Sequence, residues 1–77
     1  MILEVATLNI RADGRKDFEA AFPAAARILS SAEGYISHQL QRSVDTGNRY
    51  VLLVNWQTKQ NHHFFDRPPA VEHYEMI

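Results

Sequence analysis

The chain contains the stretch RYVLLVNW at residues 49–56, and this stretch decides the fold class. Its side chains are mostly aromatic, β-branched or aliphatic, a composition typical of β-strands. Because successive side chains of a strand point to opposite faces, this strand is apolar on both of its faces. The stretch therefore predicts a buried strand within a sheet.

A second strand is expected just before it, over residues 35–43. In that segment one set of alternating side chains is more polar than the other, with Ile36, His38, Leu40 and Arg42 alternating with Tyr35, Ser37, Gln39 and Gln41. The segment DTGN at 45–48 predicts a hairpin, in which Gly47 is available for a positive φ. We expect the two strands to pair antiparallel.

Two further strands are expected at the ends of the chain. Residues 2–10, ILEVATLNI, are largely apolar on both faces, as in a strand that is covered on two sides. Such a strand needs a helix on one face and another layer on the other. A last strand is expected from about Val71 to Ile77, after a break at Pro68 and Pro69.

An amphipathic helix is expected after the first strand, from about Gly14 to Ser31, with Asp13 as its N-cap and Gly34 as its stop. Steps of three and four residues define its apolar stripe, which comprises Phe18, Ala21, Phe22, Ala25, Ile28 and Leu29. Pro23 conflicts with a regular helix, because proline loses a hydrogen bond and crowds the preceding turn. We expect a kink near Glu19 to Pro23 or, alternatively, a helix that starts late with Pro23 in its first turn.

Length and composition limit what the protein can be. The 77 residues predict a single α+β domain, residues 1–77, and because the chain has no cysteine to crosslink so small a core, association with another chain is favoured. Eight basic and nine acidic residues give a net charge of −1, with no basic cluster for a nucleic acid or a membrane surface. The N-terminal residues show no signal-like pattern, so a cytoplasmic location is expected.

The sequence resembles the antibiotic biosynthesis monooxygenase (ABM) family. The resemblance rests on ILEVA at 2–6, GYISHQLQR at 34–42, RYVLLVNW at 49–56, and HFFD at 63–66 with Pro69, Val71, Glu72, His73 and Tyr74. It implies a ferredoxin-like antiparallel sheet, a split βαβ arrangement, and a homodimer in which two sheets face each other as a dimeric α/β barrel. In this family the last strand often reaches across to the partner.

The chain departs from the family between Gln60 and His63. Members of the family carry a second helix there, whereas here the two matching parts follow each other almost directly. The second helix is therefore missing or shortened. Either the protein has a deletion, or a stretch of the natural chain is left out of this sequence; we favour the omission, because a deletion would leave one sheet face without its cover.

The resemblance also implies a chemistry. Members that oxidise aromatic polyketides use no metal or flavin, and the substrate itself supplies a carbanion that reacts with oxygen. An oxidoreductase of this kind needs no cofactor, and the expected substrate is a small aromatic or quinone-type compound. Trp56 matches the family's strand-end tryptophan, whose indole N–H can donate to a substrate oxygen. The alternative is that Trp56 only packs between sheet and helix.

His62 is the second candidate catalytic residue. It lies where some members place a pocket tyrosine and many others a histidine, and a histidine suits proton transfer near neutral pH. The alternative is a solvated histidine in a polar segment. Leu52 replaces the family asparagine that orients a substrate carbonyl, and this departure argues against polyketide oxidation in the usual style.

Haem and metal ions are not expected. Haem-degrading relatives need an asparagine that corresponds to Ala6 here, and Asn9 cannot replace it because it points to the opposite face. The four histidines do not form a metal-ligand spacing, since His62 and His63 are adjacent and point apart. Asp66 with Glu72 or Glu75 could pass for an acid/base pair, but solvated charges are the better interpretation.

Two hypotheses for the function follow. In the first, the protein is an enzyme whose pocket near Trp56 binds a small aromatic compound and promotes its oxidation by oxygen. In the second, it is a non-catalytic dimeric module that binds a small apolar ligand or only associates with itself.

Overall fold

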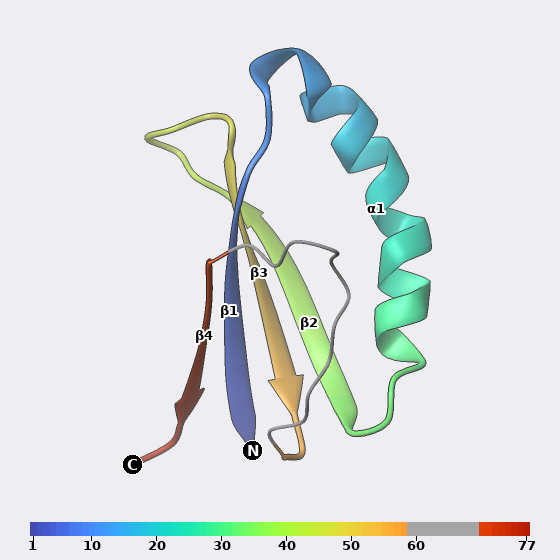
Figure 1. Ribbon diagram of the computed structural model, residues 1–77, viewed down its shortest axis with the longest axis vertical. Coiled ribbons are helices and arrows are strands. Elements are labelled where there is room, and N and C mark those ends of the chain that lie inside the picture. Colours follow the sequence, from blue (N-terminus) through green and yellow to red (C-terminus); the bar gives the residue numbers. More distant parts are fainter. Residues whose placement is uncertain (59–69) are drawn as a thin grey trace.

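In the described part of the chain, four strands form one antiparallel sheet in the order β2-β3-β1-β4, and the helix α1 lies on one face of it (Figure 1). The computed structural model describes residues 1–58 and 70–77. Along the chain the elements are β1 (Ile2–Asn9), a 3-10 turn (Ala12–Gly14), α1 (Arg15–Ser30), β2 (Tyr35–Arg42), β3 (Arg49–Trp56) and β4 (Ala70–Glu75). This order confirms the expected α+β, ferredoxin-like fold. The helix in the described part of the chain is not long and apolar enough to cross a membrane.

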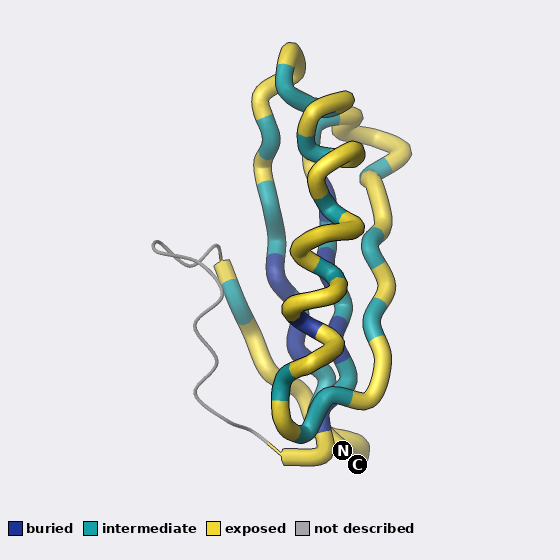
Figure 2. Tube along the Cα trace, turned by 90° about the vertical axis from the view of Figure 1, so that its right-hand side faces the viewer, coloured by how far each residue is buried: buried dark blue, intermediate teal, exposed yellow. Residues whose placement is uncertain are grey.

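The core lies between α1 and the two central strands. Strand β1 pairs with β3 on one side and with β4 on the other, and β2 pairs with β3. Because side chains alternate along a strand, one set from each central strand faces the helix. The core cluster consists of Ala6, Leu29, Leu52, Val54 and Trp56, all less than a tenth exposed. In Figure 2 the buried segments accordingly lie in β1, β3 and one point of α1.

The helix matches its expected stripe only in part and lacks its expected cap. Of the stripe residues, Leu29 is buried, Phe18 and Phe22 are half-buried, and Ala21, Ala25 and Ile28 are exposed. Its N-cap is Gly14 and not Asp13, and no side chain caps it. Asp13 lies in the preceding 3-10 turn, where it pairs with Arg11 at 3.3 Å. At the other end the helix stops at Ser30 with Ser31 as its C-cap, before the expected stop at Gly34, and Gly34 has a φ of 84° in the turn that leads into β2.

Pro23 lies inside α1, which runs without interruption from Arg15 to Ser30. The alternative of a helix that begins at Pro23 is therefore wrong. Pro23 is exposed, so its ring meets the solvent and not the sheet. The helix continues past the hydrogen bond that Pro23 cannot donate, and further along it is anchored by Leu29, which is buried in the core with residues of β1 and β3.

The β2–β3 hairpin follows the predicted antiparallel pairing but closes differently. Gly47 does not have a positive φ, since among the described glycines only Gly34 does. The Ser43 hydroxyl instead accepts hydrogen bonds from the amides of Asp45 and Thr46, at 3.2 and 2.9 Å. A side chain thus organises the turn that the sequence assigned to glycine.

The sheet face turned away from α1 is apolar in its centre. It carries the alternate side chains of β1 and β3, which are half-buried and include Leu3, Val5, Thr7, Val51, Leu53 and Asn55. Within the described residues no element packs on this face. The expected second helix, and the break at Pro68 and Pro69, fall on residues 59–69, outside the described part of the chain.

We predict that Pro23→Ala stabilises the protein. An interior proline costs a helix about 3 kcal/mol, and losing its restraint on the unfolded chain gives back up to about 1 kcal/mol. The free energy of unfolding should therefore rise by about 1–2 kcal/mol in urea titrations. Ala24→Ser, at the next exposed position, is the control and should change it by less than about 0.5 kcal/mol. A loss of stability in Pro23→Ala would show that the sheet packing requires a helix bent at Pro23.

Candidate functional site

A small apolar cavity lies between α1 and the central strands. Its volume is about 200 Å³. Among the described residues its walls include Leu8, Phe18, Phe22, Ile28, Leu29 and Leu52, and its one charged lining residue is Glu4. Aliphatic and aromatic walls with a single polar group are the usual composition of a site for a small organic ligand.

Glu4 is held at the cavity by the register of the sheet. Its position on β1 places it on the helix-facing side, between Ile2 and Ala6, and the residue is only 9% exposed. Its partner across the β1–β4 pair is His73, whose Nε2 lies 3.1 Å from the Glu4 carboxylate oxygen Oε1. The His73 side chain is 26% exposed and that of Glu4 is 11% exposed. The imidazole therefore supplies the hydrogen bond that a buried carboxylate requires.

This pair can move a proton. A carboxylate that accepts from Nε2–H fixes the tautomer of the imidazole and leaves Nδ1 as an acceptor. Of the two residues only Glu4 lines the cavity, so the Glu4 carboxylate is the group that can take a proton from a ligand held there, and His73 acts through its contact with Glu4.

The structure places the two predicted catalytic residues elsewhere. Trp56 ends β3 in the core, is 1% exposed and packs edge-on against Tyr35 with ring centroids 6.2 Å apart. It does not line the cavity that contains Glu4. This is the position expected for a packing role, and its role as a donor stays a prediction. His62 lies outside the described residues.

Leu52 lines the cavity at the position where the family has an asparagine. The wall is therefore apolar at the point where that asparagine would donate a hydrogen bond to a substrate. Ala6 is fully buried beside Leu52 in the core. In the described part of the chain no three His, Asp or Glu side chains gather as metal ligands would. The expectations for metal and haem remain predictions.

Sequence reasoning missed Glu4 and His73. The signal for Glu4 was present, because an acidic residue stands among the inward positions of an otherwise apolar strand. No comparable signal marks His73, since only the β1–β4 register brings it opposite Glu4. The two residues are 69 positions apart in the chain.

Comparison with known proteins agrees with the fold and with the resemblance. The model of the antibiotic biosynthesis monooxygenase family matches residues 1–75. The uncharacterized protein YczJ of Bacillus subtilis is 34% identical over 95 aligned positions that cover both chains completely. Since this chain has 77 residues, the alignment opens gaps in it, in agreement with a chain that is short for its family.

Solved structures show the same architecture. A protein from Bordetella bronchiseptica assigned to the antibiotic biosynthesis monooxygenases is 29% identical, with a TM-score of 0.85 over 99% of this chain and 96% of its own. A heme-degrading protein from Mycobacterium tuberculosis, at 17% identity, shares the fold with a TM-score of 0.77 over 99% of this chain and 93% of its own.

We predict that Glu4 and His73 depend on each other for stability. His73→Leu leaves the buried carboxylate without its partner and should lower the free energy of unfolding by about 1–3 kcal/mol. The double variant Glu4→Leu/His73→Leu removes both polar groups. Its loss in free energy of unfolding should be smaller than the sum of the losses in the single variants Glu4→Leu and His73→Leu. Urea titrations at one protein concentration measure all three variants, with Glu33→Leu, an exposed carboxylate, as control. Additive effects in the double variant would contradict the pairing.

Proposed function

The chain belongs to the antibiotic biosynthesis monooxygenase family, and on that premise we propose that it oxidises a small aromatic compound with molecular oxygen, without metal or flavin. The reaction takes place in the cavity between α1 and the sheet. The observation that carries this proposal is the Glu4–His73 pair, which brings a proton acceptor to the wall of an otherwise apolar cavity. Its proposed setting is the cytoplasm.

The size of the cavity supports a substrate with one aromatic ring. An apolar cavity of about 150 Å³ is known to bind benzene, and the cavity here has about 200 Å³. One ring with one or two substituents fits this volume. Phe18 and Phe22 line the cavity and can contact the faces or edges of such a ring.

The proposed reaction converts a phenol to a quinone. The Glu4–His73 pair accepts the phenolic proton, and the anion places negative charge on the ring carbon opposite the oxygen. That carbon adds O₂ to form a hydroperoxide, which loses water and leaves a second C=O group. The phenol thus gains one oxygen atom and loses two hydrogens, and the other oxygen atom leaves as H₂O.

Trp56 and His62 enter the proposal in lesser roles. Trp56 packs in the core at the end of β3. Because it does not line the cavity, its indole N–H is proposed to donate to a ligand oxygen only if the ligand extends beyond the cavity wall. His62 is proposed to relay protons to the solvent. The main proton acceptor is assigned to Glu4 with His73 because their contact is described, and the role of His62, which lies outside the described residues, stays a proposal.

A second candidate function is binding of the aromatic ligand without oxidation. The observation that favours it is Leu52, which gives the cavity an apolar wall where the family has a substrate-orienting asparagine. Oxygen uptake separates the two functions, because a binding module takes up none.

We predict that Glu4→Gln lowers turnover while ligand binding remains. Gln keeps the shape of the side chain but cannot accept the proton, and loss of general base catalysis typically costs about 10²–10⁴-fold. The measurement is oxygen uptake with 2-methylphenol, a one-ring phenol whose para carbon carries hydrogen, corrected for its spontaneous oxidation, together with quenching of the single tryptophan. Glu33→Gln is the matched control. Full turnover in Glu4→Gln would rule out the assigned base, and quenching without oxygen uptake in the unaltered protein would establish the binding module.

We also propose that two copies form a homodimer through the sheet face turned away from α1. The support is its half-buried apolar centre, which includes Val5 and Leu53 directly opposite each other on β1 and β3. Covering such a face removes apolar area from water, at about 25 cal/mol per Å². Two sheets packed face to face are a common way of meeting this need.

We predict a light-scattering mass of two chains at micromolar concentration. Leu53→Asp introduces a charge at the centre of the face and should give one chain. Val44→Asp adds the same charge at the hairpin, where Val44 is 97% exposed, and should remain dimeric. A mass of one chain for the unaltered protein would refute the dimer whatever the variants show.

A further inference from the structure

A second hollow lies at the hairpin end of the molecule, between α1, β2 and the start of β3. Its volume is about 760 Å³. It differs from the cavity of Glu4 because it combines charged and apolar walls. The charged lining residues are Arg15, Glu19 and Arg42, and apolar lining residues include Phe22, Leu40 and Val44.

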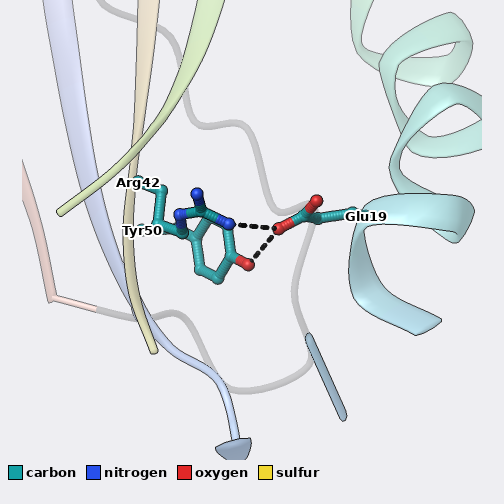
Figure 3. A network of polar contacts seen from close by, with 3 residues as sticks. All are labelled: Glu19, Arg42 and Tyr50. Carbon is teal, nitrogen blue, oxygen red and sulfur yellow. Dashed lines mark hydrogen bonds and ion pairs between the residues drawn. The ribbon is translucent and has the colours of Figure 1, made fainter. Parts of the chain in front are cut away.

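The one acidic residue of this hollow is already engaged. Figure 3 shows Glu19 reaching from α1 toward β2 and β3, where its Oε2 accepts from the hydroxyl of the buried Tyr50. The same oxygen accepts from Nη1 of Arg42 at 3.5 Å, a long contact between two half-exposed side chains. Glu19 therefore balances at most one of the two guanidinium groups.

Arg15 is the cation that remains without a counter-charge. It is the first residue of α1, and its Nη1 lies over Gly47 of the hairpin, 3.5 Å from the point that a Cβ atom would occupy there. Its Nε is buried and has no hydrogen-bond partner. Within residues 1–58 and 70–77 its side chain makes no hydrogen bond or ion pair. A buried donor of a charged group is unfavourable unless something accepts from it.

The charges around the hollow do not supply that acceptor. An adjoining hollow shares Arg15, Glu19 and Arg42 and adds Asp13 and Lys16 to its lining. Asp13 is paired with the exposed Arg11, so it does not neutralise Arg15. The region as a whole retains an excess of positive charge beside an apolar wall.

We propose that this hollow binds a small carboxylate with an apolar body. The planar guanidinium of Arg15 presents donors in a fork that matches a carboxylate, and Arg42 adds a second positive charge across the hollow. The apolar body packs against Leu40 and Val44; Val44 is otherwise 97% exposed. The site is separate from the proposed oxidation site, and Phe22 is the one residue that lines both.

The test is a titration followed by ¹⁵N–¹H spectra at constant ionic strength, with benzoate, benzamide and acetate as probes. Benzoate should shift the amides of Ser43, Val44 and Gly47 saturably. Benzamide, which lacks the charge, and acetate, which lacks the apolar body, should each bind at least about tenfold more weakly. Shifts confined to residues of the other cavity, such as Leu8 and Leu52, would place benzoate there and overturn the proposal.

Three variants test the assignment of charges. Arg15→Gln should weaken benzoate binding about tenfold or more without lowering the melting temperature, since its side chain has no protein partner to lose. Glu19→Gln keeps an acceptor for Tyr50 but removes the competing charge, so it should strengthen binding. Arg27→Gln, the same change near the other end of α1, is the matched control and should leave binding unchanged.

The proposal is overturned by any of four results: no saturable benzoate binding, equal binding of benzamide or acetate, equal losses in Arg15→Gln and Arg27→Gln, or weaker binding in Glu19→Gln. The probes and variants leave Glu4 and His73 intact, so the outcome is independent of the proposed oxidation.

Discussion

The rest of the structure depends on the burial of every second side chain of β3 beneath α1. Tyr50, Leu52, Val54 and Trp56 are all buried on this face. Because a shift of one residue would turn all four to the opposite face, their burial fixes the register of β3 against β1. That register in turn decides which residues of β1 face the helix, and it sends the carboxylate of Glu4 inward opposite Val54. The candidate site is thus a consequence of packing a neighbouring strand.

The sequence allowed the elements to be predicted better than the contacts between them. The central strands were identified by runs that are apolar on both faces, the strand at 35–43 by alternation, the last strand by its place after the two prolines, and α1 by helical spacing. The N-cap at Asp13 was predicted wrongly, since the cap is Gly14 and Asp13 pairs with Arg11. The hairpin was predicted correctly, but Gly47 does not use a positive φ, and the Ser43 hydroxyl organises the turn instead. The Glu4–His73 contact could not be predicted, since it joins the two ends of the chain through a pairing that no local pattern encodes.

A single helix serves two hollows of different chemistry. The apolar side chains of α1 line the small cavity above β1 and β3. The first turns of α1, which carry Arg15 and Glu19, line the larger hollow beside the hairpin. Among the described residues Phe22 lines both hollows, and its ring centroid lies 6.2 Å from that of Phe18. The two hollows differ in their charged groups, which are Glu4 in the smaller one and Arg15, Glu19 and Arg42 in the larger one. The chemistry of each hollow is therefore set by its own charged residues, while the apolar wall is partly shared.

Glu4 is costly for so small a domain, and this cost is the strongest argument for a function. A fold of this size has little core, and an apolar residue at the same position would extend the cluster of Ala6, Leu52 and Val54 without the penalty of desolvating a carboxylate. The hydrogen bond from His73 offsets that penalty only in part, because one bond cannot replace the hydration of two carboxylate oxygens. An inward carboxylate that weakens the core is typical of residues retained for chemistry, since proteins depart from the rules of packing mainly at functional sites. Arg15, at the start of α1, is unfavourable for the same reason with the opposite charge. Its guanidinium lines a hollow, and its buried Nε has no hydrogen-bond partner among the described residues.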